Sequence, residues 1–252
     1  MSIDKKINPS IGNLNSCAGL RLLEIKPTDI GLCYGNEVGD KIIYASMNSQ
    51  KIVGVIKSKD RYDLINKKIQ EKELTNIDLL NPETIFDVKL KDYFDFVIVD
   101  GTSKEFVDMK SKKMYLDFFH QIMKKIKRGG KIFFAVDNLL HYKTFFHNLT
   151  SVKKKKNLLS KVGYISLLDK AGFTNTMSYA VFPDNSFPLA ILPIGENANF
   201  DYHQVNYPNN EKNRINKIVS KVQRLVDAIL FKNLKLSSLS PSFIFIGTNP
   251  KQ

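Results

Sequence analysis

Two acidic side chains stand directly behind apolar runs of the sequence, where they could take part in chemistry. Asp100 closes the run DFVIVDG, and Asp137 with Asn138 closes the later run KIFFAVDN. Continuous apolar runs predict strands that are covered on both faces, and the amphipathic stretch between them predicts a helix. Because ligands of open α/β sheets bind beyond the carboxyl ends of the strands, we expect Asp100 and Asp137 to point into one crevice.

His141 could supply a general base on the loop after Asp137. A side chain with a pKa near neutrality suits proton removal from a hydroxyl acceptor, so Asp137 or His141 would polarise the acceptor. A surface position for His141 and an Asx turn at Asp137-Asn138 are the structural alternatives. Asp100 could likewise cap the next helix instead of facing a ligand. No spacing typical of metal ligands is visible in the sequence.

Strands and helices alternate along the chain, which predicts a parallel sheet with helices on both faces. The expected strands are IGLCYGN, which includes the loop after the strand, KIVGVIKS, 77–80, 94–99, 131–136, 176–182 and SPSFIFIGTN. The expected helices are GDKIIYASMN, DRYDLINKKIQEK, 104–127, GYISLLDKAGF with Gly172 as its stop, and 211–234. The last of these is a basic amphipathic helix. It falls in a segment at about 195–240 whose apolar residues otherwise show no regular spacing.

The composition indicates a globular chain with a basic surface. Of the 252 residues 43% are hydrophobic, enough for one α/β domain, and 38 basic against 25 acidic residues give a formal net charge of +13. Such a charge favours anionic partners, but lysines outnumber arginines, so nucleic acid is not the favoured partner and is not excluded. Two cysteines, no apolar leader and no long apolar run predict a cytoplasmic protein.

Four segments carry a resemblance to the class I S-adenosylmethionine-dependent methyltransferase family: DFVIVDG, IKRGGKIFFAVDN, LLDKAGFTNTMSYAVFPD and PSFIFIGT. The resemblance implies a Rossmann-like seven-stranded sheet, mostly parallel, whose antiparallel last strand lies between strands five and six. We therefore expect an amino-terminal extension at 1–25 and a methyltransferase-like domain at 26–252, with an insert at about 195–240. The segment AVFPDNSFPLAILP also resembles an element of methyltransferase-like proteins of bacterial lipopolysaccharide and polysaccharide biosynthesis.

The same resemblance implies S-adenosylmethionine as the cofactor and assigns contacts to it. They would come from Gly31, Tyr34, Gly35, Asn36, Ser58, Asn81 and Asp100. Several positions depart from the family. The glycine loop reads GLCYGNEVG, Lys57 and Ser58 stand where the family has an acidic residue for the ribose, and Asn81 replaces an aspartate near the adenine. A lysine cannot accept a hydrogen bond from the ribose.

Two interpretations follow from these departures. The chain is either a methyltransferase with a modified cofactor loop, or a catalytically inactive scaffold of the same fold that binds a protein or RNA partner. For the enzyme, a saccharide or glycolipid is the expected acceptor. The helix at 211–234 would pack on the domain or on a twin subunit in a homodimer, or it would contact a membrane surface peripherally, which would make the protein membrane-associated.

Overall fold

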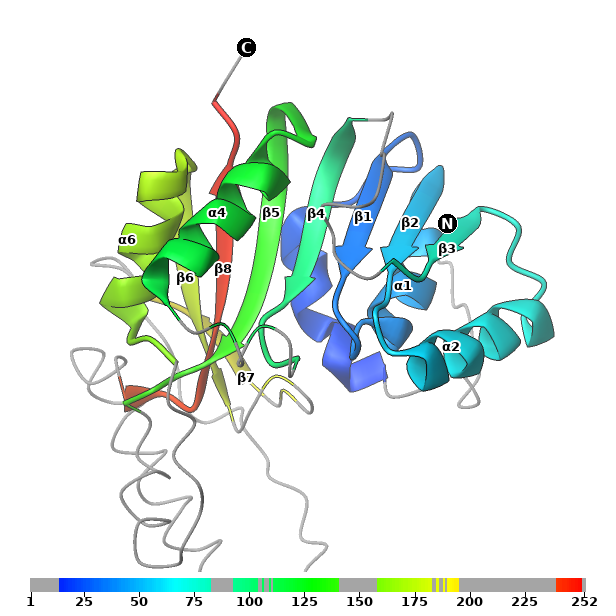
Figure 1. The fold of residues 1–252 in the computed structure, drawn as a ribbon, viewed down its shortest axis with the longest axis horizontal. Coiled ribbons are helices and arrows are strands. Elements are labelled where there is room, and N and C mark those ends of the chain that lie inside the picture. Colours follow the sequence, from blue (N-terminus) through cyan, green and yellow to red (C-terminus); the bar gives the residue numbers. More distant parts are fainter. Residues whose placement is uncertain are drawn as a thin grey trace, which may run out of the picture.

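One mixed sheet of eight strands forms the centre of the protein (Figure 1). The computed structural model describes residues 14–82, 93–103, 106, 109, 111–140, 158–182, 185, 188, 190–194 and 239–250. The strands are β1 (Ile30–Tyr34), β2 (Lys51–Val55), β3 (Ile77–Leu80), β4 (Phe94–Asp100), β5 (Ile126–Asp137), β6 (Thr174–Phe182), β7 (Ala190–Pro193) and β8 (Ser242–Thr248). The helices are η1 (Leu14–Leu23, a 3-10 helix), α1 (Gly39–Ser46), α2 (Lys59–Glu71), α4 (Lys112–Met123) and α6 (Lys161–Ala171).

The strand order β3-β2-β1-β4-β5-β8-β6-β7 confirms the expected architecture. Strands β1 to β5 pair in parallel, and β8 is antiparallel to both of its neighbours, β5 and β6. The number of strands exceeds the expected seven, because β7 returns along β6 and pairs antiparallel with it. The predicted α/β sheet, mostly parallel with an antiparallel last strand in the sequence, is therefore present with one further edge strand.

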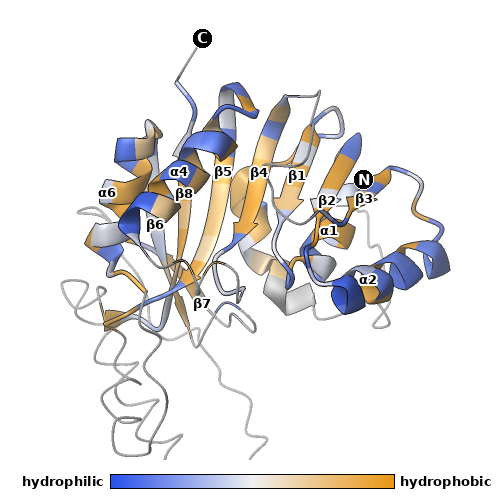
Figure 2. Cartoon of the chain, in the orientation of Figure 1, coloured by the Kyte–Doolittle hydropathy of each residue, from blue (hydrophilic) through white to orange (hydrophobic). Residues whose placement is uncertain are grey.

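Helices cover both faces of the sheet, as expected. On one face α4 and α6 pack on side chains such as Val97, Phe134 and Phe245. On the other face η1, α1 and α2 pack on side chains such as Phe96 and Phe133. Figure 2 shows the central strands as apolar along most of their length, whereas α2 is mostly hydrophilic. Strands buried on both faces account for the continuous apolar runs in the sequence.

An aromatic cluster fills the layer between α4, α6 and the sheet. Phe134 of β5 lies at its centre, with ring centroids 5.0 Å from Phe119, 5.1 Å from Phe106 and 5.5 Å from Tyr164. Most of these rings meet edge to face or tilted, the arrangements that aromatic quadrupoles favour. The cluster fixes β4, β5 and β8 against the two helices and so defines where their carboxyl ends lie.

Short polar side chains and one glycine set the helix ends. The hydroxyls of Ser58, Ser111 and Ser160 cap α2, α4 and α6 by accepting a hydrogen bond from a backbone N–H of the first turn. Gly172 ends α6 in the left-handed conformation, with φ of 97°, which confirms the predicted stop. Helix α4 is shorter than predicted, and β5 begins at Ile126, ahead of the glycine pair.

The amino-terminal segment and the insert are described to different extents. Within the segment predicted as an extension, η1 packs on the sheet face through Cys17, Leu20 and Leu23, all of which are buried. The amphipathic helix predicted at 211–234 lies outside the described residues. Among the helices of the described ranges, none is both long enough and apolar enough to cross a bilayer.

Candidate cofactor and acceptor site

The strand order reverses between β1 and β4, and open α/β sheets bind ligands beyond the carboxyl ends of the strands at such a reversal; this edge of the sheet is called the crevice below. Gly35 follows β1 with φ of +131°, a conformation that other residues rarely adopt. A Cβ at this position would lie 3.1 Å from the Cβ of Asp100, so the loop after β1 approaches the end of β4 closely. The structure thus brings Gly35 and Asp100, both predicted as cofactor contacts, to the same point.

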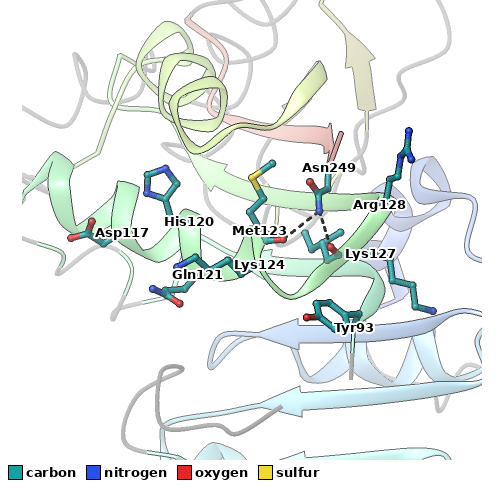
Figure 3. Close-up of a pocket in the computed structure, with 10 residues that line it drawn as sticks. Tyr93, Asp117, His120, Gln121, Met123, Lys124, Lys127, Arg128 and Asn249 are labelled. Carbon is teal, nitrogen blue, oxygen red and sulfur yellow. Dashed lines mark hydrogen bonds between the residues drawn. The ribbon is translucent and has the colours of Figure 1, made fainter. Parts of the chain in front are cut away.

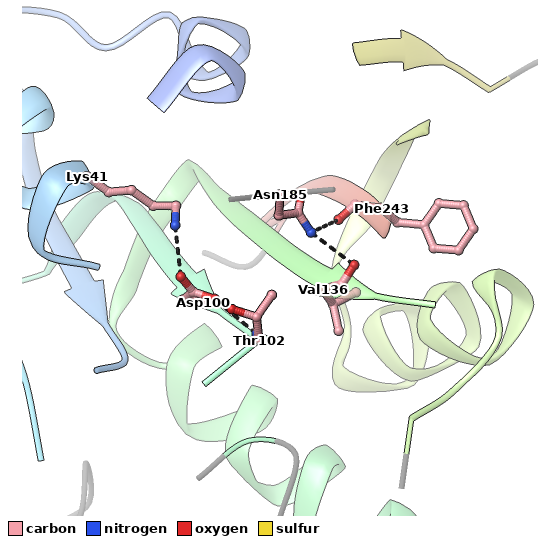
Figure 4. Close-up of polar contacts among 6 residues, drawn as sticks. All are labelled: Lys41, Asp100, Thr102, Val136, Asn185 and Phe243. Carbon is pink, nitrogen blue, oxygen red and sulfur yellow. Dashed lines mark hydrogen bonds and ion pairs between the residues drawn. The ribbon is translucent and has the colours of Figure 1, made fainter. Parts of the chain in front are cut away.

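A buried ion pair lies beneath this loop (Figure 4). Lys41, in the first turns of α1, places its Nζ 2.8 Å from Oδ2 of Asp100, and both side chains are almost fully buried. Asp100 Oδ1 accepts hydrogen bonds from the N–H of Thr102 at 3.0 Å and from its hydroxyl at 2.6 Å. Cap residue Ser111 begins α4, so Asp100 does not cap that helix.

Both members of the pair are ionised over a wide pH range. Burial by itself would lower the pKa of the Lys41 ammonium, but the Asp100 carboxylate raises this pKa above its ordinary value. Burial would likewise raise the pKa of Asp100, but Lys41 and the Thr102 hydrogen bonds hold it below its ordinary value. The crevice therefore contains a fixed positive and a fixed negative charge side by side. Sequence reasoning missed Lys41, because a lysine in an amphipathic helix usually faces solvent.

Tyr34 and Gly31 lie inside the sheet layers. The ring of Tyr34 is buried on the α4 face, with its centroid 5.1 Å from that of Phe118. Gly31 is near the start of β1, where an added Cβ would stand 2.2 Å from Phe96 Cζ. The structure therefore gives both residues a packing role. Gly31 therefore lies away from the carboxyl end of β1, whereas Tyr34 is the last residue of that strand.

Asn36, Ser58 and Asn81 meet at the ends of β1, β2 and β3. Asn36 Oδ1 accepts from the Ser58 N–H at 2.8 Å, and Asn81 Nδ2 donates to the carbonyls of Ile56 at 2.6 Å and Lys57 at 2.9 Å. The Ser58 hydroxyl is 3.5 Å from the Arg61 N–H that it caps. These predicted contacts are thus close together, and hydrogen bonds to neighbouring groups fix their orientation.

Glu37 stands between Gly35 and Gly39 in the loop after β1. Its carboxylate makes an ion pair of 2.9 Å with Arg61 of α2, and both side chains are about half exposed. The pair ties the loop after β1 to the first turn of α2.

Asp137 and Asn138 lie beyond β5 in different environments. Asp137 is half-buried, and its Oδ1 accepts from the Ser242 hydroxyl at 3.2 Å. Asn138 is buried, donates to the Ser240 carbonyl at 2.8 Å and accepts from the Leu140 N–H at 3.0 Å. Asn138 thus forms the Asx turn that was the alternative to a functional role. His141 lies outside the described residues.

Asn185 is a buried polar residue that sequence reasoning did not single out. Its Nδ2 donates to the carbonyls of Val136 at 3.1 Å and Phe243 at 3.4 Å, at the carboxyl end of β5 (Figure 4). Its Oδ1 is buried and has no hydrogen-bond partner in the structure as described. The only signal in the sequence was its place in the segment PDNSFP, which carried the resemblance to proteins of polysaccharide biosynthesis.

Comparison with known proteins identifies the fold. No family model and no curated protein matches the sequence. Among solved structures, a methyltransferase of Thermotoga maritima described as a possible histamine N-methyltransferase is 15% identical, with a TM-score of 0.56 over 95% of this chain and 91% of that chain. A putative sarcosine dimethylglycine methyltransferase of Galdieria sulphuraria is 12% identical, with a TM-score of 0.55. That match covers 93% of this chain and 83% of the other chain.

A third similar structure is phosphoethanolamine N-methyltransferase 2 of Haemonchus contortus, in complex with S-adenosylhomocysteine. It is 15% identical, with a TM-score of 0.61, and the match covers 95% of this chain but 53% of the longer enzyme. At such identities the likeness concerns the fold. The chain has the class I S-adenosylmethionine-dependent methyltransferase fold, as the four sequence segments implied.

Proposed function

We propose that the chain binds S-adenosylmethionine at the carboxyl ends of β1 to β4 and transfers its methyl group to an acceptor near β5. The observation that carries this proposal is the Lys41–Asp100 ion pair at the point where the strand order reverses. Bound S-adenosylmethionine would supply a methyl group on a sulfonium: an acceptor oxygen or nitrogen would attack this methyl in line, S-adenosylhomocysteine would leave, and the acceptor would lose its proton. The fold contributes chiefly proximity and orientation of the two reactants.

The ion pair matches the amino-acid end of the cofactor in charge. An α-ammonium and an α-carboxylate are complementary to the Asp100 carboxylate and the Lys41 ammonium, respectively. Gly35 provides close backbone approach at the same point. The Nδ2 of Asn81 donates to the carbonyls of Ile56 and Lys57, so its Oδ1 is left to accept a hydrogen bond from the amino group of the adenine. Glu37 and Lys57 are the departures, and they predict weaker binding of the ribose than in other methyltransferases.

The acceptor would lie over the ends of β4 and β5. Asp137 would orient an acceptor hydroxyl or amine, and His141 on the following loop would take its proton. A saccharide or a glycolipid remains the proposed acceptor class, on the resemblance of the PDNSFP segment alone. Asn185, from this segment, reaches the end of β5 in the structure, which supports a place for the segment beside the acceptor.

Isothermal titration tests the cofactor proposal. S-adenosylhomocysteine is expected to bind saturably, and 5′-methylthioadenosine, which keeps the nucleoside but lacks the amino-acid end, is expected to bind about ten-fold or more weakly because it forgoes the charged contacts. Lys41→Met should weaken only the first ligand. If neither ligand binds at millimolar concentration, the chain does not use this cofactor. Equal affinity for both ligands would exclude the role of Lys41 and Asp100.

The second candidate is an inactive scaffold, and a specific observation favours it. The polar groups of the crevice are satisfied by one another: Lys41 by Asp100, Asn36 by Ser58, and Asn81 by the carbonyls after β2. At this edge of the sheet the named side chains therefore have hydrogen-bond partners without a ligand. Absence of binding in the same titration, with the fold intact by circular dichroism, supports this candidate.

A further inference from the structure

A hollow lies at the opposite edge of the sheet, where β4 and β5 begin (Figure 3). It has a volume of about 1100 Å³ and is bounded by the carboxyl end of α4, by Tyr93 before β4 and by the first residues of β5. Asn249, after β8, forms part of its wall and donates from Nδ2 to the carbonyls of Met123 and Ile126. The hollow is far along the strands from the crevice, so its function does not depend on the cofactor proposal.

The wall of the hollow is basic. Lys124, Lys127 and Arg128 line it, and Asp117 is the only carboxylate among its lining residues in the described part of the chain. Lys127 is held by Asp95, with Nζ–O distances of 2.9 and 2.8 Å. Lys124 and Arg128 are exposed and make no ion pair with any described residue. Two cations are therefore available to an anionic ligand.

An exposed aromatic ring stands next to these cations. Tyr93 is 62% exposed, an unusual value for a large ring beside a sheet. Gln121 of α4 also lines the hollow and offers an amide that can hydrogen-bond to a base edge, whereas Nε2 of His120 lies 3.3 Å from the Lys170 carbonyl oxygen. A ring with an open face, polar side chains and nearby cations are the parts from which single-stranded nucleic acid sites are built.

We propose that this hollow binds single-stranded RNA, with a base stacked on Tyr93 and the flanking phosphates on Lys124 and Arg128. The net charge of +13 would bring such a ligand to the surface, and the hollow would hold it at a defined place. A membrane surface fits less well, because the site is concave and Tyr93 is its one strongly exposed apolar side chain among the described residues.

Fluorescence anisotropy with a labelled oligouridine of about twelve nucleotides tests the proposal on the full chain. We expect binding at low salt that weakens as salt rises. Tyr93→Ala should reduce the affinity about ten-fold, whereas Tyr93→Phe, which keeps the ring, should leave it within about two-fold of the unsubstituted protein. Lys124→Ala/Arg128→Ala should also reduce the affinity about ten-fold and should lower the slope of affinity against salt.

A matched control separates the hollow from the general basic charge. Lys67→Ala/Lys72→Ala also removes two positive charges, one from α2 and one from its C-cap residue, on the face of the sheet opposite α4, and should change the affinity by less than about two-fold. Equal losses in the two double variants would overturn the proposal, as would undiminished binding by Tyr93→Ala. Equal affinity for a duplex of the same length would also contradict it, because a duplex offers no unstacked base to Tyr93.

Discussion

The two halves of the sheet are built from different side chains. Around β4, β5 and β8 the core is aromatic, and Phe134 touches rings from α4, α6 and β8. Around β1, β2 and β3 the core is largely aliphatic, and the carboxyl ends carry the Lys41–Asp100 pair and the amides of Asn36 and Asn81.

The difference shows that the parts of the sequence that specify the fold and those that specify the ligand are separate. The aromatic half matches the methyltransferase segments closely, since its residues are fixed by packing. The aliphatic half departs from the family at Glu37, Lys57 and Asn81, where a ligand rather than the core would decide the side chain. Five predictions test this division.

Phe134→Ala should have the largest effect. It removes the ring at the centre of the aromatic cluster and should lower the free energy of unfolding by about 3–5 kcal/mol. Urea denaturation followed by circular dichroism measures this loss. A loss below about 1 kcal/mol would show that the aromatic half does not dominate the stability.

Lys41→Met should have the next largest effect. It should lower the free energy of unfolding by about 3 kcal/mol, because it leaves the Asp100 carboxylate buried without its partner. Lys41→Met/Asp100→Asn should recover part of the loss. The control is Lys67→Met, which breaks an exposed pair with Glu71 and should cost between about 0 and 1 kcal/mol. Equal losses for Lys41→Met and Lys67→Met would refute a structural role of the buried pair.

The same pair predicts a pH dependence. The folded pKa of Asp100 lies below the ordinary 3.8, so its contribution is present above that pH and is lost as the pH falls through the folded value. The folded pKa of Lys41 lies above the ordinary 10.5, so its contribution is present below that pH and is lost as the pH rises through the folded value. The stability difference between the unsubstituted protein and Lys41→Met/Asp100→Asn should be flat between these limits and shrink outside them.

Gly31→Ala should cost about 2 kcal/mol by overpacking, since the new Cβ would stand 2.2 Å from Phe96 Cζ and 2.8 Å from Ile52 Cδ1. Adding Phe96→Leu should make the combined loss smaller than the sum of the two single losses. A strictly additive result would show that Phe96 is not what constrains this position. No change in S-adenosylhomocysteine affinity is expected, since Gly31 lies in the core.

The smallest effects compare one serine from each half. Ser160→Ala and Ser58→Ala each remove a helix cap and should each lower the free energy of unfolding by about 1 kcal/mol. Ser58 lies beside the crevice and Ser160 does not, so titration with S-adenosylhomocysteine should detect a change for Ser58→Ala alone. An equal change in affinity for both variants would indicate a global effect.

The sequence predicted the strands of the sheet and most helix positions, because apolar period and the Gly172 stop are local signals, whereas the place of β8 between β5 and β6 was implied by the family resemblance. It did not predict β7, whose pairing depends on the return of the chain along β6. It also missed the packing of η1, where Cys17 and Leu20 are buried within an otherwise polar stretch.

The candidate site was predicted less completely than the fold. Asp100, Gly35, Asn36, Ser58 and Asn81 do gather at one edge, as strand ends require. Their partners could not be predicted, because Lys41 and Asp100 are 59 residues apart in sequence and no local pattern joins them. The burial of the Tyr34 ring against Phe118 could not be predicted either, because the direction of a side chain at a strand end depends on the register, which the loop sequence does not reveal.

The Asx turn after β5 has a consequence for how such a protein can diversify. Asn138 hydrogen-bonds to Ser240 and Pro241, and Leu139 donates to Leu159, so the chain before and after residues 141–157 and the chain after residue 238 are tied together at the end of β5. Insertions or exchanges between these tied ends would leave the strand pairing unchanged. Selection could therefore replace whatever these segments recognise while the domain continues to fold.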